Sequence, residues 1–261
     1  MPACPRRKGS CVTFCSCVSS SWNSPSAKAA TDVPAYITAA IADAGRPPED
    51  KAQDANRKPA EVLAFAGIKP GDKVVDLMPG SGYYTRIFSK IVGPKGVVYA
   101  LQPTEIDKVA PKGLKALRTF AGTPAYANVV VLVQPVAAIA IPQRVNMVWT
   151  SQNYHDLHNP MMGTPDMANI DKTIFNALKP GGIFLVLDHA ATAGSGIADT
   201  NTLHRIDPAV AKTEVTAAGF EFVGESDVLR NPDDNHTLPI FDKSIKGKTD
   251  KFIDKFRRPM Q

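Results

Sequence analysis

Short apolar runs alternate along this chain with amphipathic stretches, and this alternation constrains the fold more than any other feature. The runs are rich in Val, Ile and Leu and are bounded by Gly and Pro turns, as buried strands are. We predict strands over residues 73–78, 96–101, 129–133, 145–150, 183–188, 220–223 and 251–256, and helices over residues 82–92, 167–178 and 208–218. Apolar strands separated by helices predict an α/β fold in three layers, with a mostly parallel sheet and a late antiparallel strand.

The first 30 residues differ from the rest of the chain. Basic residues at positions 6–8 precede a weakly apolar stretch over 9–18, and Ala27-Lys28-Ala29 has the pattern of a cleavage site. This is the layout of a secretory signal, although the apolar part contains no Leu or Ile. Export and a cytoplasmic location both stay open, and a disordered tail or a misassigned start codon is the alternative to a signal peptide.

Composition limits the other possibilities. The net charge of +5 is concentrated at the ends, where residues 1–30 and 242–261 each carry +4, which leaves −3 for the middle. A nucleic-acid enzyme would carry its basic charge around its cleft, so we predict no nucleic-acid partner. No stretch approaches the roughly 18 apolar residues of a membrane span. All four cysteines lie within the first 17 residues, which excludes a disulfide framework for the body of the chain. We expect residues 31–66 to form an N-terminal helical cap and residues 67–261 to form the α/β domain.

The loop after the first predicted strand, Asp76-Leu77-Met78-Pro79-Gly80-Ser81-Gly82, is glycine-rich. Its glycines let the backbone approach a ligand, and the next helix offers free N–H groups. Ligands of parallel sheets bind at the carboxyl ends of the strands. A dinucleotide fingerprint would need glycine at Thr85, and a phosphate-binding P-loop would need Gly-Lys-Ser/Thr. Both are absent, and a tight turn without a ligand is the alternative.

Two segments make the prediction more specific. Asp76-x-x-x-Gly80-x-Gly82 resembles the cofactor loop of class I S-adenosylmethionine (SAM)-dependent methyltransferases, and Leu178-Lys179-Pro180-Gly181-Gly182 resembles the turn before their fifth strand. Residues 153–158, 203–207 and 230–232 resemble, more narrowly, a bacterial group of predicted methyltransferases that often carry export leaders. The resemblance extends from about residue 59 to 258. It implies a Rossmann-like fold, SAM as the cofactor and methyl transfer as the activity.

The resemblance also implies a set of cofactor-binding residues, and the chain departs from the family pattern at some of them. Gln102 stands where the family usually has a ribose-binding acid, Met78 replaces the usual first glycine, and no acid follows the third strand. These departures favour the alternative of a non-catalytic binding protein that keeps the fold. The predicted cofactor-binding residues are Asp76, Met78, Pro79, Gly80, Ser81, Gly82, Tyr83, Tyr84, Gln102 and Asn153.

Histidines follow the ends of two predicted strands. His155 and His158 come after the strand over 145–150, and His189 ends the strand over 183–188, so these loops should face the glycine loop. Methyl transfer is an in-line displacement that depends on alignment, and an oxygen or nitrogen acceptor often also needs a base. The predicted catalytic residues are His155 or His158 as the base, Asp156 and Asp188 as orienting partners, and His189.

The remaining predictions concern the acceptor, which we expect to be a small molecule. Tyr154 is predicted to shape its pocket. The long polar segment over 192–207 is predicted to be a lid that brings His204 and Arg205 to the acceptor. A surface pair of Arg205 with Asp207 that caps the next helix is the alternative. Structural histidines are a further alternative, and so is a metal held by His155, His158, Asp188 and His189, which we rank below a metal-free base.

Overall fold

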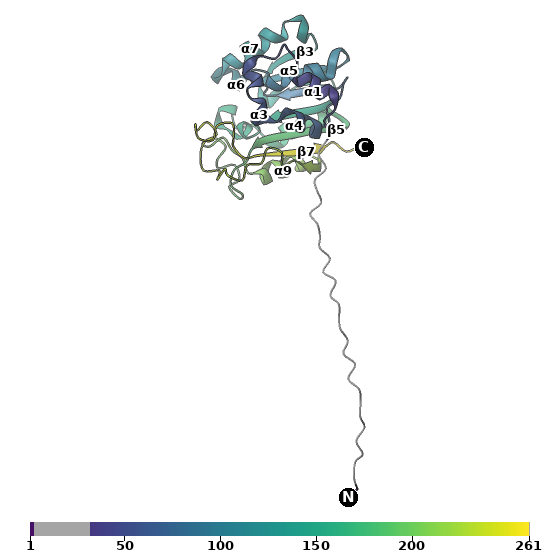
Figure 1. Ribbon diagram of the computed structural model, residues 1–261. Helices are drawn as coiled ribbons and strands as arrows, with labels where there is room; N and C mark the ends of the chain where they lie inside the picture. The colour runs from purple at the N-terminus through teal and green to yellow at the C-terminus, as the bar shows by residue number, and fades with distance from the viewer. Residues whose placement is uncertain (3–31, 261) are drawn as a thin grey trace. The chain divides into compact units, whose positions relative to one another are not determined.

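Seven strands form one sheet in the order β3-β2-β1-β4-β5-β7-β6 (Figure 1). The computed structural model describes residues 1–2 and 32–260. Strands β1 to β5 are parallel, and β7 runs antiparallel to both β5 and β6. The α/β fold predicted from the sequence is thereby confirmed, including its late antiparallel strand. The strands are β1 (Lys73–Leu77), β2 (Val97–Pro103), β3 (Val129–Gln134), β4 (Val145–Ser151), β5 (Leu178–His189), β6 (Glu221–Glu225) and β7 (Lys251–Arg257).

Helices cover both faces of this sheet. The core on one face contains side chains from α1 (Ala35–Ile41), α4 (Pro59–Ala66), α5 (Tyr83–Val92) and α7 (Pro111–Ala121). The core on the other face contains side chains from α6 (Thr104–Val109), α8 (Met167–Ala177) and α9 (Pro208–Ala217). The short elements are α2 (Pro48–Lys51), α3 (Asp54–Arg57), η1 (Gly93–Lys95), η2 (Pro124–Tyr126), η3 (Val136–Ala138), η4 (His155–His158) and η5 (Pro160–Met162).

Burial on both faces explains the continuous apolar strands. Successive side chains of a strand point to opposite faces, so a central strand needs apolar residues at every position. In β1, Val74 belongs to the core under α5 and Val75 to the core under α8. In β4, Trp149 belongs to the core under α5 and Val148 to the core under α8.

One local prediction differs from the structure, and two helices were not predicted. The predicted turn over 179–182 lies inside β5, where Gly181 has a φ of +74° and the pairing with β4 shifts register between Val145 and Met147. The glycine thus makes the strand irregular without ending it. Helices α6 and α7 were not predicted, although Leu114, Leu117 and Phe120 repeat at helical spacing and are buried.

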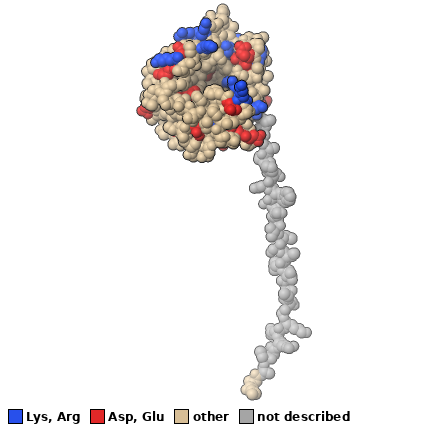
Figure 2. All heavy atoms as spheres, turned by 90° about the vertical axis from the view of Figure 1, so that its left-hand side faces the viewer, with Lys and Arg blue, Asp and Glu red and all other residues tan. Residues whose placement is uncertain are grey.

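The chain from Thr31 to Gln261 forms one compact unit that includes α1 to α4. The predicted leader and its cysteines fall almost entirely outside the described residues, so the signal peptide and the location stay predictions. Among the described residues, no helix is long and apolar enough to cross a bilayer. On the face drawn in Figure 2, Lys and Arg side chains lie among Asp and Glu side chains.

Candidate active site

A cavity of about 550 Å³ lies at the carboxyl ends of β1, β4 and β5. Its size is within the usual range for small-molecule sites. The order of the sheet reverses between β1 and β4, and ligands of open α/β sheets bind at such a point. Of the residues predicted for the site, those that line this cavity are Asp76, Met78, Pro79, Gly80, Ser81, Tyr83, Tyr84, Asn153, His155, Asp156, His189 and His204.

The loop after β1 is built from left-handed backbone conformations. Met78, Gly80 and Gly82 have φ values of +56°, +58° and +89°. A Cβ on Gly80 would have no atom within 4 Å, because this position faces open space. A Cβ on Gly82 would lie 2.5 Å from the Phe120 ring, so only glycine fits at the start of α5. Gly82 therefore shapes the loop without lining the cavity.

Asn153 fastens this loop to the end of β4. Its Nδ2 donates to the carbonyl of Met78 at 2.8 Å, and its Oδ1 accepts from the hydroxyl of Thr150. The side chain lines the cavity, yet these hydrogen bonds use both ends of its amide. Asn153 thus holds the glycine loop in place, which is an indirect role in any cofactor site.

Asp76 is a buried carboxyl group at the end of β1. Burial raises its pKa to about 7, although the Thr85 hydroxyl, which donates to it at 2.6 Å, and the charge of Arg57 act in the opposite direction. The hydroxyl of Tyr84 is buried nearby and has no hydrogen-bond partner among the described residues. The Arg57 guanidinium lies 4.4 Å from the centre of the Tyr83 ring. A cationic ligand group would be stabilised here by the Asp76 carboxylate.

His155, which lines the same cavity, is held between two carboxylates. Its Nδ1 lies 2.8 Å from Oδ1 of Asp188, and its Nε2 lies 3.3 Å from Oδ1 of Asp156. Burial lowers the pKa of His155, but the two carboxylates outweigh this effect and raise it to about 10. The ring is then protonated at neutral pH. The predicted role of general base does not suit this charge state, whereas the predicted orienting contacts of Asp156 and Asp188 are present.

His158 and Tyr154 lie away from the cavity, contrary to their predicted roles. Nε2 of His158 lies 3.1 Å from Oε2 of Glu214 in α9. The Tyr154 hydroxyl lies 3.0 Å from both Glu214 and Asp171, and its ring is completely buried in the core. Both residues turn inward because acids from α8 and α9 satisfy their polar atoms.

Arg205 is also not an acceptor-binding residue in this structure. Its buried guanidinium pairs with both carboxylate oxygens of Asp234, at 2.9 and 3.1 Å, and donates to the carbonyl of Ala190. The alternative of a surface pair with Asp207 is wrong too. Asp207 caps α9 by accepting from the N–H of Ala209, as that alternative required, but its partner is not Arg205.

Two further predicted residues have different surroundings. His189 lines the cavity, and its Nδ1 lies 2.8 Å from the hydroxyl of Thr249. Burial and the charge of Lys251 lower its pKa well below the usual range, so its ring is neutral. Gln102 is buried at the end of β2 outside the cavity wall, and its Oε1 has no partner among the described residues. The predicted ribose contact of Gln102 is therefore not preformed.

Other lining residues were missed by the sequence analysis. Gln53 and Arg57 come from the helical cap, and Ile240 and Phe241 come from the loop before β7. No local motif marks these positions, because only the tertiary fold brings them to the sheet edge. The predicted lid contributes only His204 to the wall, and lid movement stays a prediction.

Comparison with known protein sequences gives methyltransferases that differ in the acceptor they methylate. A family model described as protein-L-isoaspartate(D-aspartate) O-methyltransferase matches residues 49–135. The ubiquinone/menaquinone biosynthesis C-methyltransferase UbiE of Hydrogenovibrio crunogenus is 26% identical over 192 residues, which cover 68% of this chain and 66% of that protein. The protein-L-isoaspartate O-methyltransferase of Ignicoccus hospitalis is 37% identical over 75 residues, covering 28% of this chain and 32% of its own. The chain thus spans less than two thirds of the length of either relative.

A solved structure supports the same fold. The SAM-dependent methyltransferase from Aquifex aeolicus aligns with a TM-score of 0.55 at 20% identity, over 81% of this chain and 98% of that one. The fold is that of the class I SAM-dependent methyltransferases. In sequence, the chain is similar to methyltransferases, which supports the predicted enzyme class. The structural neighbour from Aquifex aeolicus is a SAM-dependent enzyme, in line with the predicted cofactor.

Proposed function

We propose that this protein transfers a methyl group from SAM to a small-molecule acceptor. One observation carries the proposal: a single cavity is lined both by the glycine loop after β1 and by His155, Asp156 and His204. A methyltransferase needs cofactor and acceptor to meet in one space, because the displacement at the methyl carbon is in line.

In this proposal the cofactor lies against the loop after β1. The Asp76 carboxylate accepts from the ammonium group of SAM, and the open space beside Gly80 admits the ligand to the backbone. Arg57 of the helical cap lies on the cavity wall near the same carboxylate and supplies a cation for the ligand's carboxylate. The ionised groups of SAM would thus find charges of opposite sign.

The acceptor then occupies the side of the cavity that carries the histidines. Asp188 fixes the ring of His155, and His204 is partly exposed to the cavity. Ile240 and Phe241 add an apolar wall. Such a wall with a few polar groups suits a small, partly apolar molecule with a hydroxyl or amine nucleophile.

Calorimetric titration with SAM and with its demethylated product, S-adenosylhomocysteine (SAH), tests the proposal. We expect both to bind the wild-type protein with 1:1 stoichiometry. Gly80→Val would place a branched side chain in the cavity and should weaken SAM binding at least tenfold. Gly71→Val is the matched control, since Gly71 also has a positive φ and open space but lies before β1, at the other end of the strand. No binding by the wild type, or equal affinities in both variants, would contradict the proposal.

Activity is measured with methyl-labelled SAM and a panel of phenols, catechols, quinols and small amines. Methyl transfer to at least one class is the expected result. The alternative of a non-catalytic binding protein, which the missing ribose acid favours, predicts tight SAM or SAH binding with no transfer to any member of the panel.

A further inference from the structure

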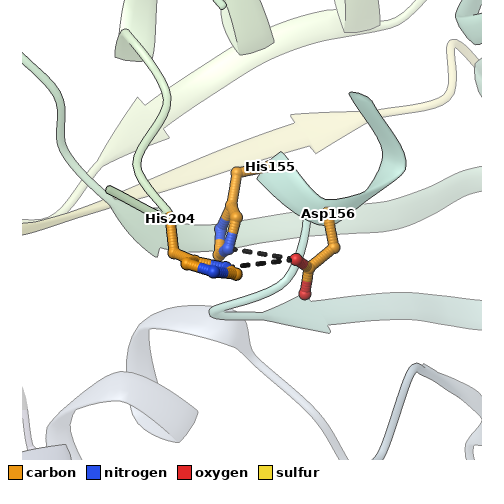
Figure 3. Close-up of side chains that lie close together, drawn as sticks. All are labelled: His155, Asp156 and His204. Atoms are coloured by element: carbon orange, nitrogen blue, oxygen red, sulfur yellow. Dashed lines mark ion pairs between the residues drawn. The ribbon is translucent and has the colours of Figure 1, made fainter. Parts of the chain in front are cut away.

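We propose that His155, Asp156 and His204 bind a divalent transition-metal ion at the acceptor side of the cavity. Figure 3 shows the three side chains directed toward one another, with both histidine rings facing the Asp156 carboxylate. His155 and Asp156 come from η4, and His204 comes from the loop before α9. One ligand atom from each residue lies within 4.8 Å of the others.

The spacing of these atoms matches a metal site better than a hydrogen-bonded triad. Oδ1 of Asp156 lies 3.3 Å from Nε2 of His155 and 3.6 Å from Nδ1 of His204. Metal–ligand bonds of about 2.0–2.1 Å in tetrahedral geometry place neighbouring ligand atoms roughly 3.3–3.4 Å apart. A direct hydrogen bond between His204 and Asp156 would need a separation nearer 2.9 Å.

The surroundings of His155 supply the outer contact that metal-binding histidines usually have. Its Nδ1 faces the fully buried Asp188 carboxylate, whose oxygens also accept from the backbone N–H groups of His155 and His189. A carboxylate that holds one ring nitrogen leaves the other directed at the metal. A cation then takes the place of the proton between Nε2 and Asp156. The ring of His204 is fixed by an edge contact with Phe241, with ring centres 4.9 Å apart.

This site differs from the metal alternative considered from the sequence. His158 is bonded to Glu214, Asp188 lies behind His155, and Nδ1 of His189 is taken up by Thr249. Only His155 is shared between the two sets. His204 lies 49 positions beyond His155 in the chain, so only the fold brings them together.

Two imidazoles and one carboxylate favour Zn²⁺, Fe²⁺, Co²⁺ or Mn²⁺ over Mg²⁺ or Ca²⁺, which prefer oxygen ligands. All three residues line the cavity, so a fourth position is open to the acceptor. This role rests on the proposed methyl transfer. An acceptor hydroxyl bound there gives its proton to water, and its oxygen forms a bond to the methyl carbon. The carbon–sulfur bond breaks with its electron pair going to sulfur, which leaves SAH and the methyl ether.

Titration with Co²⁺, followed by visible absorption and with no SAM present, tests the site. The full chain is used with Cys4, Cys11, Cys15 and Cys17 replaced by serine, so that thiolates do not compete for the metal. We expect one Co²⁺ per chain with the strong absorption of a four- or five-coordinate site, and displacement by Zn²⁺. Asp156→Asn and His204→Gln should each weaken binding at least tenfold, and Asp188→Asn by about 10- to 100-fold.

His236→Gln is the matched control, because it removes a histidine that also contacts a carboxylate, that of Asp250, outside the cavity. Its Co²⁺ affinity should equal that of the parent, and circular dichroism verifies that each variant is folded. Absence of Co²⁺ binding by the parent, or equal affinities in the His204 and His236 variants, would overturn the proposal. Since SAM is absent, this failure is distinguishable from a failure of SAM binding.

Discussion

Asp76 gives the sharpest test of the electrostatics at the end of β1. Burial raises the pKa of this carboxyl from 3.8 to about 7 in the folded chain. A raised pKa means that the folded state favours the protonated form, so the group's contribution to stability is full below pH 3.8 and is lost as the pH rises through 7. Because of this linkage, the free energy of unfolding falls by about 2.5 kcal/mol between pH 5 and pH 8.

The substitution Asp76→Asn isolates this contribution, since an amide oxygen can still accept from Thr85 but does not titrate. The free energy of unfolding, measured in urea at several pH values, should fall from pH 5 to pH 8 in the wild type by about 2.5 kcal/mol more than in the variant. Saturating SAM should reduce the difference, because its ammonium favours the carboxylate. Parallel pH profiles of the two proteins without ligand would refute the reasoning.

Three further substitutions have defined outcomes. Gly82→Ala should lower the free energy of unfolding by about 2–4 kcal/mol, because the positive φ disfavours alanine and the added Cβ would clash with the Phe120 ring. An unchanged urea unfolding curve would contradict this packing. Arg205→Met should lower the free energy of unfolding by about 3–5 kcal/mol, because it leaves the buried Asp234 carboxylate without its cationic partner. Adding Asp234→Asn should restore part of this loss. Unchanged stability of the Arg205→Met variant would show that the ion pair is dispensable. Asn153→Ala should weaken SAM binding roughly tenfold by calorimetry, since the loop loses its fastening to β4, and wild-type affinity would disprove that role.

The fold was readable from the sequence because two-sided burial leaves a strong pattern. Each central strand must be apolar at nearly every position, and the Gly and Pro turns mark where it begins and ends. The turn predicted over 179–182 lies inside β5, because the positive φ of Gly181 makes the strand irregular without ending it. Helices α6 and α7 were missed although α7 has a clear apolar repeat.

The site was only partly readable. The rule that loops at strand ends share one edge of the sheet correctly brought the residue 76–84 loop, His155 and His189 to one cavity. That rule says nothing about which way a side chain turns. Tyr154 and His158 follow the same strand as His155, yet acids on α8 and α9 draw them into the core. Buried partners distant in sequence decide these orientations, as Asp234 does for Arg205.

A crystal structure of the protein with SAH tests the central claim most directly. The account predicts the ligand in the cavity at the ends of β1 and β4, with its amino group at Asp76 and its sulfur facing His155, Asp156 and His204. An empty cavity at saturating ligand, or SAH bound at another place on the chain, would contradict it.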